Sequence, residues 1–405
     1  MSVTGTQGAF RWAAIGEVFR AFLGLGLTSF GGPVAHLGFF RDAFVTRRRW
    51  LDDGAYADIV ALCQMLPGPA SSQVGMALGL GRAGIGGALA AWAGFTLPSA
   101  AAMIAFAYLV GHVALTPDTA WAHGLKVAAA AVVANAAWNM ARNLCPDALR
   151  ATLAGVATLI VLALPGASGQ LLAIVLGALV GWRFVAAPEQ RTKADAPART
   201  NGGAGVFWFV MFFVLLALLP VLADLWPNHM LALLNRFYRA GALVFGGGHV
   251  VLPLLQAAVV PPGWIDNGTF LAGYGAAQSL PGPLFSFAAF LGTAMSDEPR
   301  GWPGGLLCLA AIYLPSFLLL FGAWPFWLRL SGNAAVKSAL AGVNAVVVGL
   351  LLAALYDPVW TSAIRSRSDF ALALVALLAL AVWRAPPWAV VLGAAGAAAA
   401  LAAVQ

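Results

Sequence analysis

Charged residues are scarce in this chain. Only 9% of its 405 residues are Asp, Glu, Lys or Arg, whereas 61% are hydrophobic. A soluble domain carries about 25% charged residues, so a soluble protein of this length could not cover its surface. The apolar runs at 206–221 and 339–355 are also too long for the short alternating strands of a membrane β-barrel. Because helices of about 20 apolar residues span a bilayer, the sequence predicts an all-α polytopic membrane protein.

Clusters of metal-binding and catalytic side chains are missing as well. Cys63, Cys145 and Cys308 are scattered, as are the five histidines, and no pair has metal-ligand spacing. We therefore expect no metal site and no cofactor. The chain lacks the GxxxxGK[ST] motif that would hold ATP phosphates, and no acid–base constellation predicts an enzyme. The net charge of +7 is typical of basic cytoplasmic loops, so nucleic acid is not an expected partner.

What the chain does contain is an internal repeat. Four landmarks recur in one order: Phe-Gly-Gly, Trp-x-Asp, Gln-x-Leu-Pro-Gly-Pro and Leu-Pro-Ser, which begin at residues 30, 50, 64 and 97 and again at 245, 264, 278 and 314. The second and third landmarks are displaced by the same 214 residues, from 50 to 264 and from 64 to 278. The sequence therefore predicts two homologous repeats, at 1–185 and 231–405, with a connecting segment at 186–230.

The connecting segment predicts an inverted arrangement. Its first part, 186–205, is rich in Pro, Gly and charge and should be a cytoplasmic linker. The apolar stretch that follows has no counterpart early in the first repeat. If each repeat crosses the membrane an even number of times, this extra helix inserts the second repeat upside down, which is a common transporter architecture. Basic loops support this topology in the first repeat, but Arg365 and Arg367 do not support it in the second.

Both glycine triplets and both Pro-Gly-Pro motifs interrupt the apolar stretches. Broken helices persist within a bilayer where they line a polar cavity, because their freed backbone groups find no water in hydrocarbon. Each break is followed by a new helix start, whose free N–H groups and partial positive charge attract anions. Four re-entrant half-helices that meet at the membrane midplane would bind a compact oxyanion without a buried Lys or Arg.

The candidate substrate-binding residues are the glycines of these breaks and the polar side chains beside them. They are Gly31, Gly32, His36, Gln64, Gly68, Ser71, Ser72, Gly246, Gly247, His249, Gln278, Gly282 and Ser286. A structural interpretation competes with this one, because glycine in membrane helices usually permits close packing and proline kinks are common there. Two Pro-Gly-Pro motifs at matched positions, each preceded by glutamine, favour the functional interpretation.

These motifs resemble those of the bacterial chromate transporter family in its long, two-domain form. The similar stretches include LTSFGGPVAH at 27–36, LPGPASSQ at 66–73, FGGGHVVLPLL at 245–255 and YGAAQSLPGPLFSF at 274–287. The resemblance implies a secondary active transporter that exports chromate, a tetrahedral oxyanion like sulfate, across the bacterial inner membrane and so confers chromate resistance. The implied partners are this oxyanion and the lipid bilayer.

Two alternative functions remain open on the sequence alone. A transporter of sulfate or of another oxyanion would have the same architecture, and so would a passive anion channel. The residues also leave open the coupling ion and whether the chain forms a homodimer.

Overall fold

The computed structural model describes residues 3–404 except 31, 113–119, 165–166, 187–201, 246–249 and 327–332. Helices are the only regular secondary structure in these described residues, which confirms the all-α prediction. Four helical segments among them are long and apolar enough to cross a membrane: Ala70–Val110, Gly203–Leu225, Gly301–Phe326 and Ala334–Ala363. Most of the expected linker, residues 187–201, lies outside the described part.

The first repeat forms seven α-helices and one π-helical turn within the described residues. They are α1 (Val3–Thr28), α2 (Gly32–Arg41), η1 (Asp42–Arg47), α3 (Asp53–Met65), α4 (Ala70–His112), α5 (Ala120–Leu144), α6 (Ala148–Ala163) and α7 (Ala167–Phe184). The predicted break at Pro-Gly-Pro separates α3 from α4. α4 itself bends at Ala83 and Gly84, whose backbone is not helical.

The second repeat follows α8 (Gly202–Leu225), the helix without an early counterpart. Its elements are α9 (His229–Ala242), α10 (Val251–Val259), α11 (Asn267–Gln278), η3 (Leu284–Ser286), α12 (Phe287–Ala294), α13 (Gly301–Ala323), η4 (Trp324–Phe326), α15 (Ala334–Ala354), η5 (Leu355–Trp360), α16 (Thr361–Ala363), α17 (Arg367–Ala381) and α18 (Pro387–Val404). The Asp266 carboxylate caps α11 by accepting a hydrogen bond from the Thr269 N–H, as the Asp52 carboxylate does for α3 from the Ala55 N–H.

Left-handed backbone conformations recur at matching places in the two repeats. The pairs of φ angles are 50° at Arg49 and 77° at Gly263, 126° at Gly68 and 96° at Gly282, and 65° at Gly84 and 66° at Gly301. Such angles are rare outside glycine, and the members of the three pairs are 214, 214 and 217 residues apart, as the neighbouring landmarks are. The sequence repeat is therefore also a repeat of backbone geometry.

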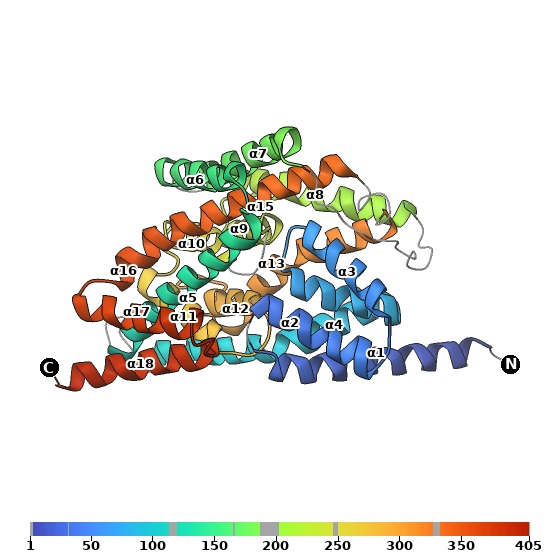
Figure 1. Cartoon of the computed structure of the whole chain (residues 1–405). Helices are drawn as coiled ribbons and strands as arrows, with labels where there is room; N and C mark the ends of the chain where they lie inside the picture. Colours follow the sequence, from blue (N-terminus) through green and yellow to red (C-terminus); the bar gives the residue numbers. More distant parts are fainter. Residues whose placement is uncertain are drawn as a thin grey trace.

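The repeats exchange helices rather than folding as separate bodies. α6 and α7 of the first repeat pack against α15 of the second, and α17 and α18 of the second pack against α5 of the first. Figure 1 shows α6 and α7 along the upper side, next to α15, and α17 and α18 at the lower left below α5. The contacts are close because glycines form them: Gly342 on α15 faces Gly177 and Gly181 on α7, a small-xxx-small pair.

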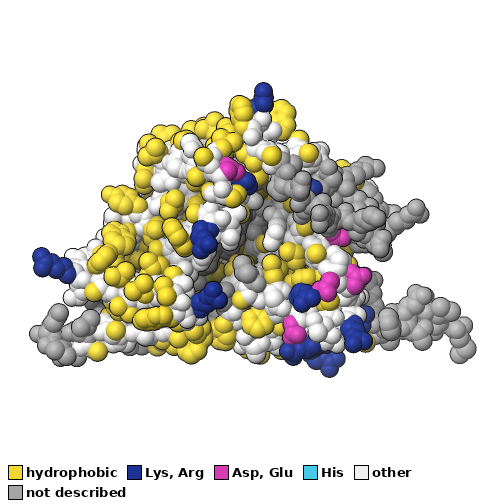
Figure 2. Space-filling model, in the orientation of Figure 1, with side chains coloured by type: hydrophobic (Ala, Val, Ile, Leu, Met, Phe, Trp, Pro, Cys, Tyr) yellow, Lys and Arg dark blue, Asp and Glu magenta, His cyan; other side chains and the backbone are white. Residues whose placement is uncertain are grey.

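Apolar side chains cover much of the outer surface. On α8, for example, Phe207, Phe213 and Val221 are more than half exposed, whereas Phe212 is buried. In Figure 2 hydrophobic side chains spread over the left of the visible face, while charged ones gather at the lower right over the end formed by α1, α2 and α3. Exposed apolar surface of this extent requires a cover of lipid or protein, which agrees with a membrane protein.

Replacing Gly342 by Ala should lower the thermal stability of the purified protein. The added methyl group would meet the carbonyl of Gly177 and the backbone of Gly181, neither of which can move without separating α7 from α15. Overpacking of this kind costs about 1–3 kcal/mol. The midpoint of thermal unfolding in detergent measures the effect. Gly393→Ala on α18 is the control, because its methyl group meets nothing within 4 Å. Equal losses in both variants would contradict this role for the α7–α15 contact.

Candidate functional site

Each Pro-Gly-Pro loop is hydrogen-bonded to the opposite repeat. The Gly68 N–H donates to the Val244 carbonyl at 2.6 Å, and the Gly282 N–H donates to the Ser29 carbonyl at 3.0 Å. Ser29 and Val244 each directly precede a Phe-Gly-Gly triplet. In each repeat, the Pro-Gly-Pro loop is thus hydrogen-bonded to the residue before the Phe-Gly-Gly triplet of the other repeat.

The Leu-Pro-Ser landmark meets the same loops. A Cβ atom on Gly68 would collide with the Ser316 hydroxyl, and a Cβ atom on Gly282 would collide with the Ser99 hydroxyl. Both glycines have positive φ angles, so backbone conformation and lack of space each require glycine. Three of the four sequence landmarks therefore meet at one interface between the repeats.

A cavity of about 620 Å³ opens beside this interface. Its described lining residues are Gly32, Pro33, Leu37, Gln64, Leu66, Gly68, Ala70, Ser71, Val132, Asn135, Ala136, Asn139, Met140, Asn143, Leu144, Ala277, Gln278, Leu280, Gly282, Leu284, Asn344, Leu380 and Pro387. None of these side chains is ionisable, and the polar ones are amides and one hydroxyl. Six predicted residues are among them: Gly32, Gln64, Gly68, Ser71, Gln278 and Gly282.

Two helix starts of the first repeat face the cavity. α2 begins at Gly32 and α4 at Ala70, and both first turns contribute lining residues. The Gln73 N–H donates to the Pro69 carbonyl, so the N–H groups of residues 70–72, which come before this first helical donor, have no acceptor within the helix. These donors and the positive ends of the two helix dipoles are groups that can attract an anion.

The start after the second Pro-Gly-Pro motif is different. Pro283 leads into the three-residue 3₁₀ turn η3 before α12, and the Ser286 N–H already donates to the Pro283 carbonyl. The fourth expected start falls at 246–249, outside the described residues. Gly31, Gly246, Gly247 and His249 likewise lie outside the described part, so the structure does not place these four candidates.

The remaining three candidates lie behind the cavity lining. The His36 Nδ1 is 3.4 Å from the Ser71 hydroxyl, and His36 is only 1% exposed. The Ser72 hydroxyl is 3.3 Å from the Tyr313 hydroxyl. The Ser286 hydroxyl donates to the Pro283 carbonyl at 2.9 Å. These contacts make His36, Ser72 and Ser286 supports of the loops, with Ser71 between His36 and the cavity.

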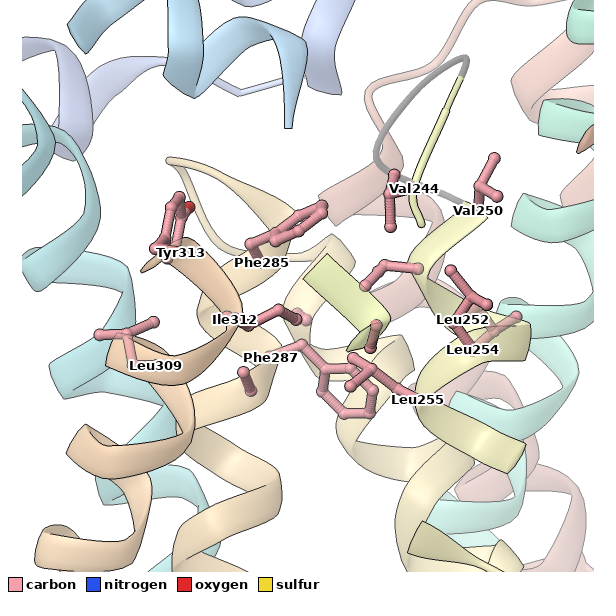
Figure 3. Close-up of a cluster of buried hydrophobic side chains, with 14 of the residues drawn as sticks. Val244, Val250, Leu252, Leu254, Leu255, Phe285, Phe287, Leu309, Ile312 and Tyr313 are labelled. Carbon is pink, nitrogen blue, oxygen red and sulfur yellow. The ribbon is translucent and has the colours of Figure 1, made fainter. Parts of the chain in front are cut away.

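Aromatic rings pack tightly near the Ser72–Tyr313 contact. Figure 3 shows Phe285 and Tyr313 side by side within a buried apolar cluster. Their ring centroids are 5.7 Å apart, and the Trp92 ring packs on Tyr313 at 5.6 Å. All this packing lies where α4, η3 and α13 meet. Asn139 and Asn143, in contrast, are exposed, so the cavity is open at their end of α5.

Sequence reasoning missed the asparagines of the cavity. Asn135, Asn139 and Asn143 come from α5 and Asn344 from α15. The signal was present in the sequence as three asparagines at intervals of four residues, which places them on one helical face. It was overlooked because none of the repeated landmarks contains them.

An apolar helical fold with a polar cavity between two interleaved repeats, whose described lining is uncharged, is the architecture expected of a membrane transport protein. The model of the chromate transporter family matches residues 16–182 and 231–400. The chain therefore belongs to the chromate transporter family, which confirms the resemblance inferred from the motifs.

Individual relatives agree with this assignment. The chromate transport protein of Cupriavidus metallidurans is 28% identical in an alignment that covers 90% of this chain and 87% of its own length. The chromate transport protein of Pseudomonas aeruginosa is 27% identical in an alignment that covers 84% of this chain and 80% of its own length. An uncharacterized transporter of Methanocaldococcus jannaschii is 26% identical in an alignment that covers 83% of this chain and 82% of its own length. No solved structure matches the chain.

Gly282→Ala should reduce the amount of folded protein. A φ of 96° is strained for alanine, at about 1–3 kcal/mol, and the added Cβ would collide with the Ser99 hydroxyl. The double variant Gly282→Ala, Ser99→Ala should recover part of the loss, because it removes the collision and keeps the strain. Gel filtration of detergent-solubilised protein measures the folded fraction. Wild-type yield from the single variant would show that this loop does not require glycine.

Proposed function

We propose that this protein is a secondary active transporter that exports chromate across the bacterial inner membrane and so confers chromate resistance. One observation carries the proposal: in a chain of the chromate transporter family, an uncharged cavity faces two helix starts and the Ser71 hydroxyl. Relatives over most of the chain are chromate transport proteins. The lipid bilayer would cover the exposed apolar surface of helices such as α8.

The polar groups of the cavity can bind a dianion and still allow its release. An oxyanion that enters the cavity gives up hydration, which the N–H groups of α4 and the surrounding amides can replace. A fixed Lys or Arg would bind more strongly but would slow release. Since a carrier must release its substrate in every cycle, a site built from dipoles and hydrogen-bond donors favours turnover.

We also propose that the repeats are inverted and that their half-helices are re-entrant. The reciprocal bonds Gly68–Val244 and Gly282–Ser29 support a pseudo-twofold relation, as does the exchange of α6–α7 for α17–α18. In transporters of this type the substrate lies at the midplane between the repeats, and alternating access comes from their relative movement. The open amide end of the cavity and the packed rings of Phe285 and Tyr313 favour a carrier over a passive channel.

Substitutions of Ser71 test this function. Ser71→Ala removes one hydrogen bond to a charged ligand, about 1.5–3 kcal/mol, and should raise the KM for chromate at least tenfold. Ser71→Asp places a negative charge at the start of α4 and should abolish transport through repulsion. The measurement is chromate uptake into inverted membrane vesicles at matched protein levels, with and without a pH gradient and with sulfate as a competitor.

The control is Ser168→Asp, since Ser168 is exposed and is the second residue of α7 as Ser71 is of α4. It should transport like the wild type. Wild-type flux in Ser71→Asp would mean that the anion passes elsewhere. Stronger uptake of sulfate than of chromate would favour the sulfate alternative. Flux without saturation or counterflow would identify a passive channel.

A further inference from the structure

Three asparagines form a continuous polar strip on α5. Asn135, Asn139 and Asn143 are four residues apart and all line the cavity. The 1.5 Å rise per residue separates Asn135 from Asn143 by about 12 Å along the helix. Asn135 is half-buried, whereas Asn139 and Asn143 are exposed. The strip thus runs from the open end of the cavity towards its interior.

The amides of the strip are ordered relative to one another. The Asn139 Nδ2 donates to the Asn135 Oδ1 at 3.3 Å. Asn135 takes part in this bond through its oxygen, so the bond uses neither of its N–H groups. Asn344 on α15 also lines the cavity and supplies an amide from the second repeat. The four asparagines therefore bring side-chain amides to a space that has no ionisable lining side chain among the described residues, and the bond within the strip uses one of their N–H donors.

Charge outside the cavity favours the entry of anions at this end. Arg142 lies beside Asn143 in the last turn of α5 and is exposed. A cationic group near the mouth of a cleft raises the local concentration of anions. The N–H groups of the amides can then bind the oxyanion without holding it as strongly as an ion pair would.

We propose that Asn139 and Asn143, with Asn135 behind them, form an outer binding site for a tetrahedral oxyanion dianion. The ion occupies this site before it reaches the inner site at Ser71 and the start of α4. The proposal rests on the proposed function, because it concerns the path of the same substrate. It assigns recognition to side chains that have no counterpart in the repeated motifs.

The strip also has a structural interpretation. Asparagines on membrane helices can hydrogen-bond across a helix–helix contact, and Asn139 and Asn143 could contact a second copy of the chain. The two interpretations predict different kinetics. A binding role changes the concentration dependence of transport, whereas a packing role changes the amount or the rate of the active protein.

The test compares variants of Asn139 in the full-length protein reconstituted into liposomes. Asn139→Leu keeps the side-chain size but removes the amide, and should raise the KM for chromate about tenfold, a factor equivalent to ~1.4 kcal/mol, at an unchanged maximal rate. Asn139→Gln restores an amide and should recover most of the affinity. The control is Trp138→Leu, an exposed side chain on the same turn that is not among the lining residues. It should have the wild-type KM.

Each outcome decides the proposal. A wild-type KM in Asn139→Leu overturns the outer site, and so does a lower maximal rate at an unchanged KM, which indicates packing. An equal rise of KM in Trp138→Leu also overturns it, because the effect would then come from α5 as a whole. Absence of any chromate transport by the wild type would instead refute the proposed function.

Discussion

The structure depends on how backbone groups at broken helices find partners where water is absent. An unpaired backbone N–H or carbonyl in an apolar interior costs several kcal/mol, so buried groups at the helix interruptions are stabilised by partners within the protein. The Gly68 N–H and the Gly282 N–H each find a carbonyl in front of the opposite Phe-Gly-Gly triplet. Each repeat therefore supplies an acceptor for the Pro-Gly-Pro loop of the other. This reciprocity holds the two repeats together at their landmarks.

The same arrangement leaves polar but uncharged groups among the described residues of the cavity lining. With Gly68 and Gly282 used to connect the repeats, the donors left for a ligand are the first N–H groups of α4, the Ser71 hydroxyl and the surrounding amides. Buried His36 and the Ser72–Tyr313 pair support these groups from behind. The loops thus perform the structural task, and the groups beside them are free for the substrate.

The sequence predicted features that depend on local chemistry. Both Pro-Gly-Pro motifs separate helices as expected, and six candidates line the cavity. Two of them stand at helix starts, and the other four lie in the Pro-Gly-Pro loops or at the ends of the helices before them. Side-chain direction further along is decided by tertiary packing, so the sequence could not show that Ser72 contacts Tyr313 or that Ser286 bonds to Pro283. The exchange of α6–α7 and α17–α18 also escaped prediction, because the sequence of an apolar helix does not indicate which helices it packs against. The stabilising role of Gly177, Gly181 and Gly342 follows from that exchange and is visible only in the structure.

The asparagine strip on α5 has no equivalent in the second repeat. This asymmetry can affect substrate affinity but cannot by itself drive net transport. At the 217-residue displacement of the landmark nearest to α5, from Leu97 to Leu314, Asn135 and Asn139 correspond to Leu352 and Tyr356, which carry no amide. If inverted repeats alternate in lining the cavity, the two open states would offer the oxyanion different surroundings and different affinities. Such a difference cannot drive export by itself, because affinities and conformational equilibria are linked around a closed cycle. If the protein exports chromate as proposed, the free energy for export therefore has to come from another source, such as the gradient of a coupled ion.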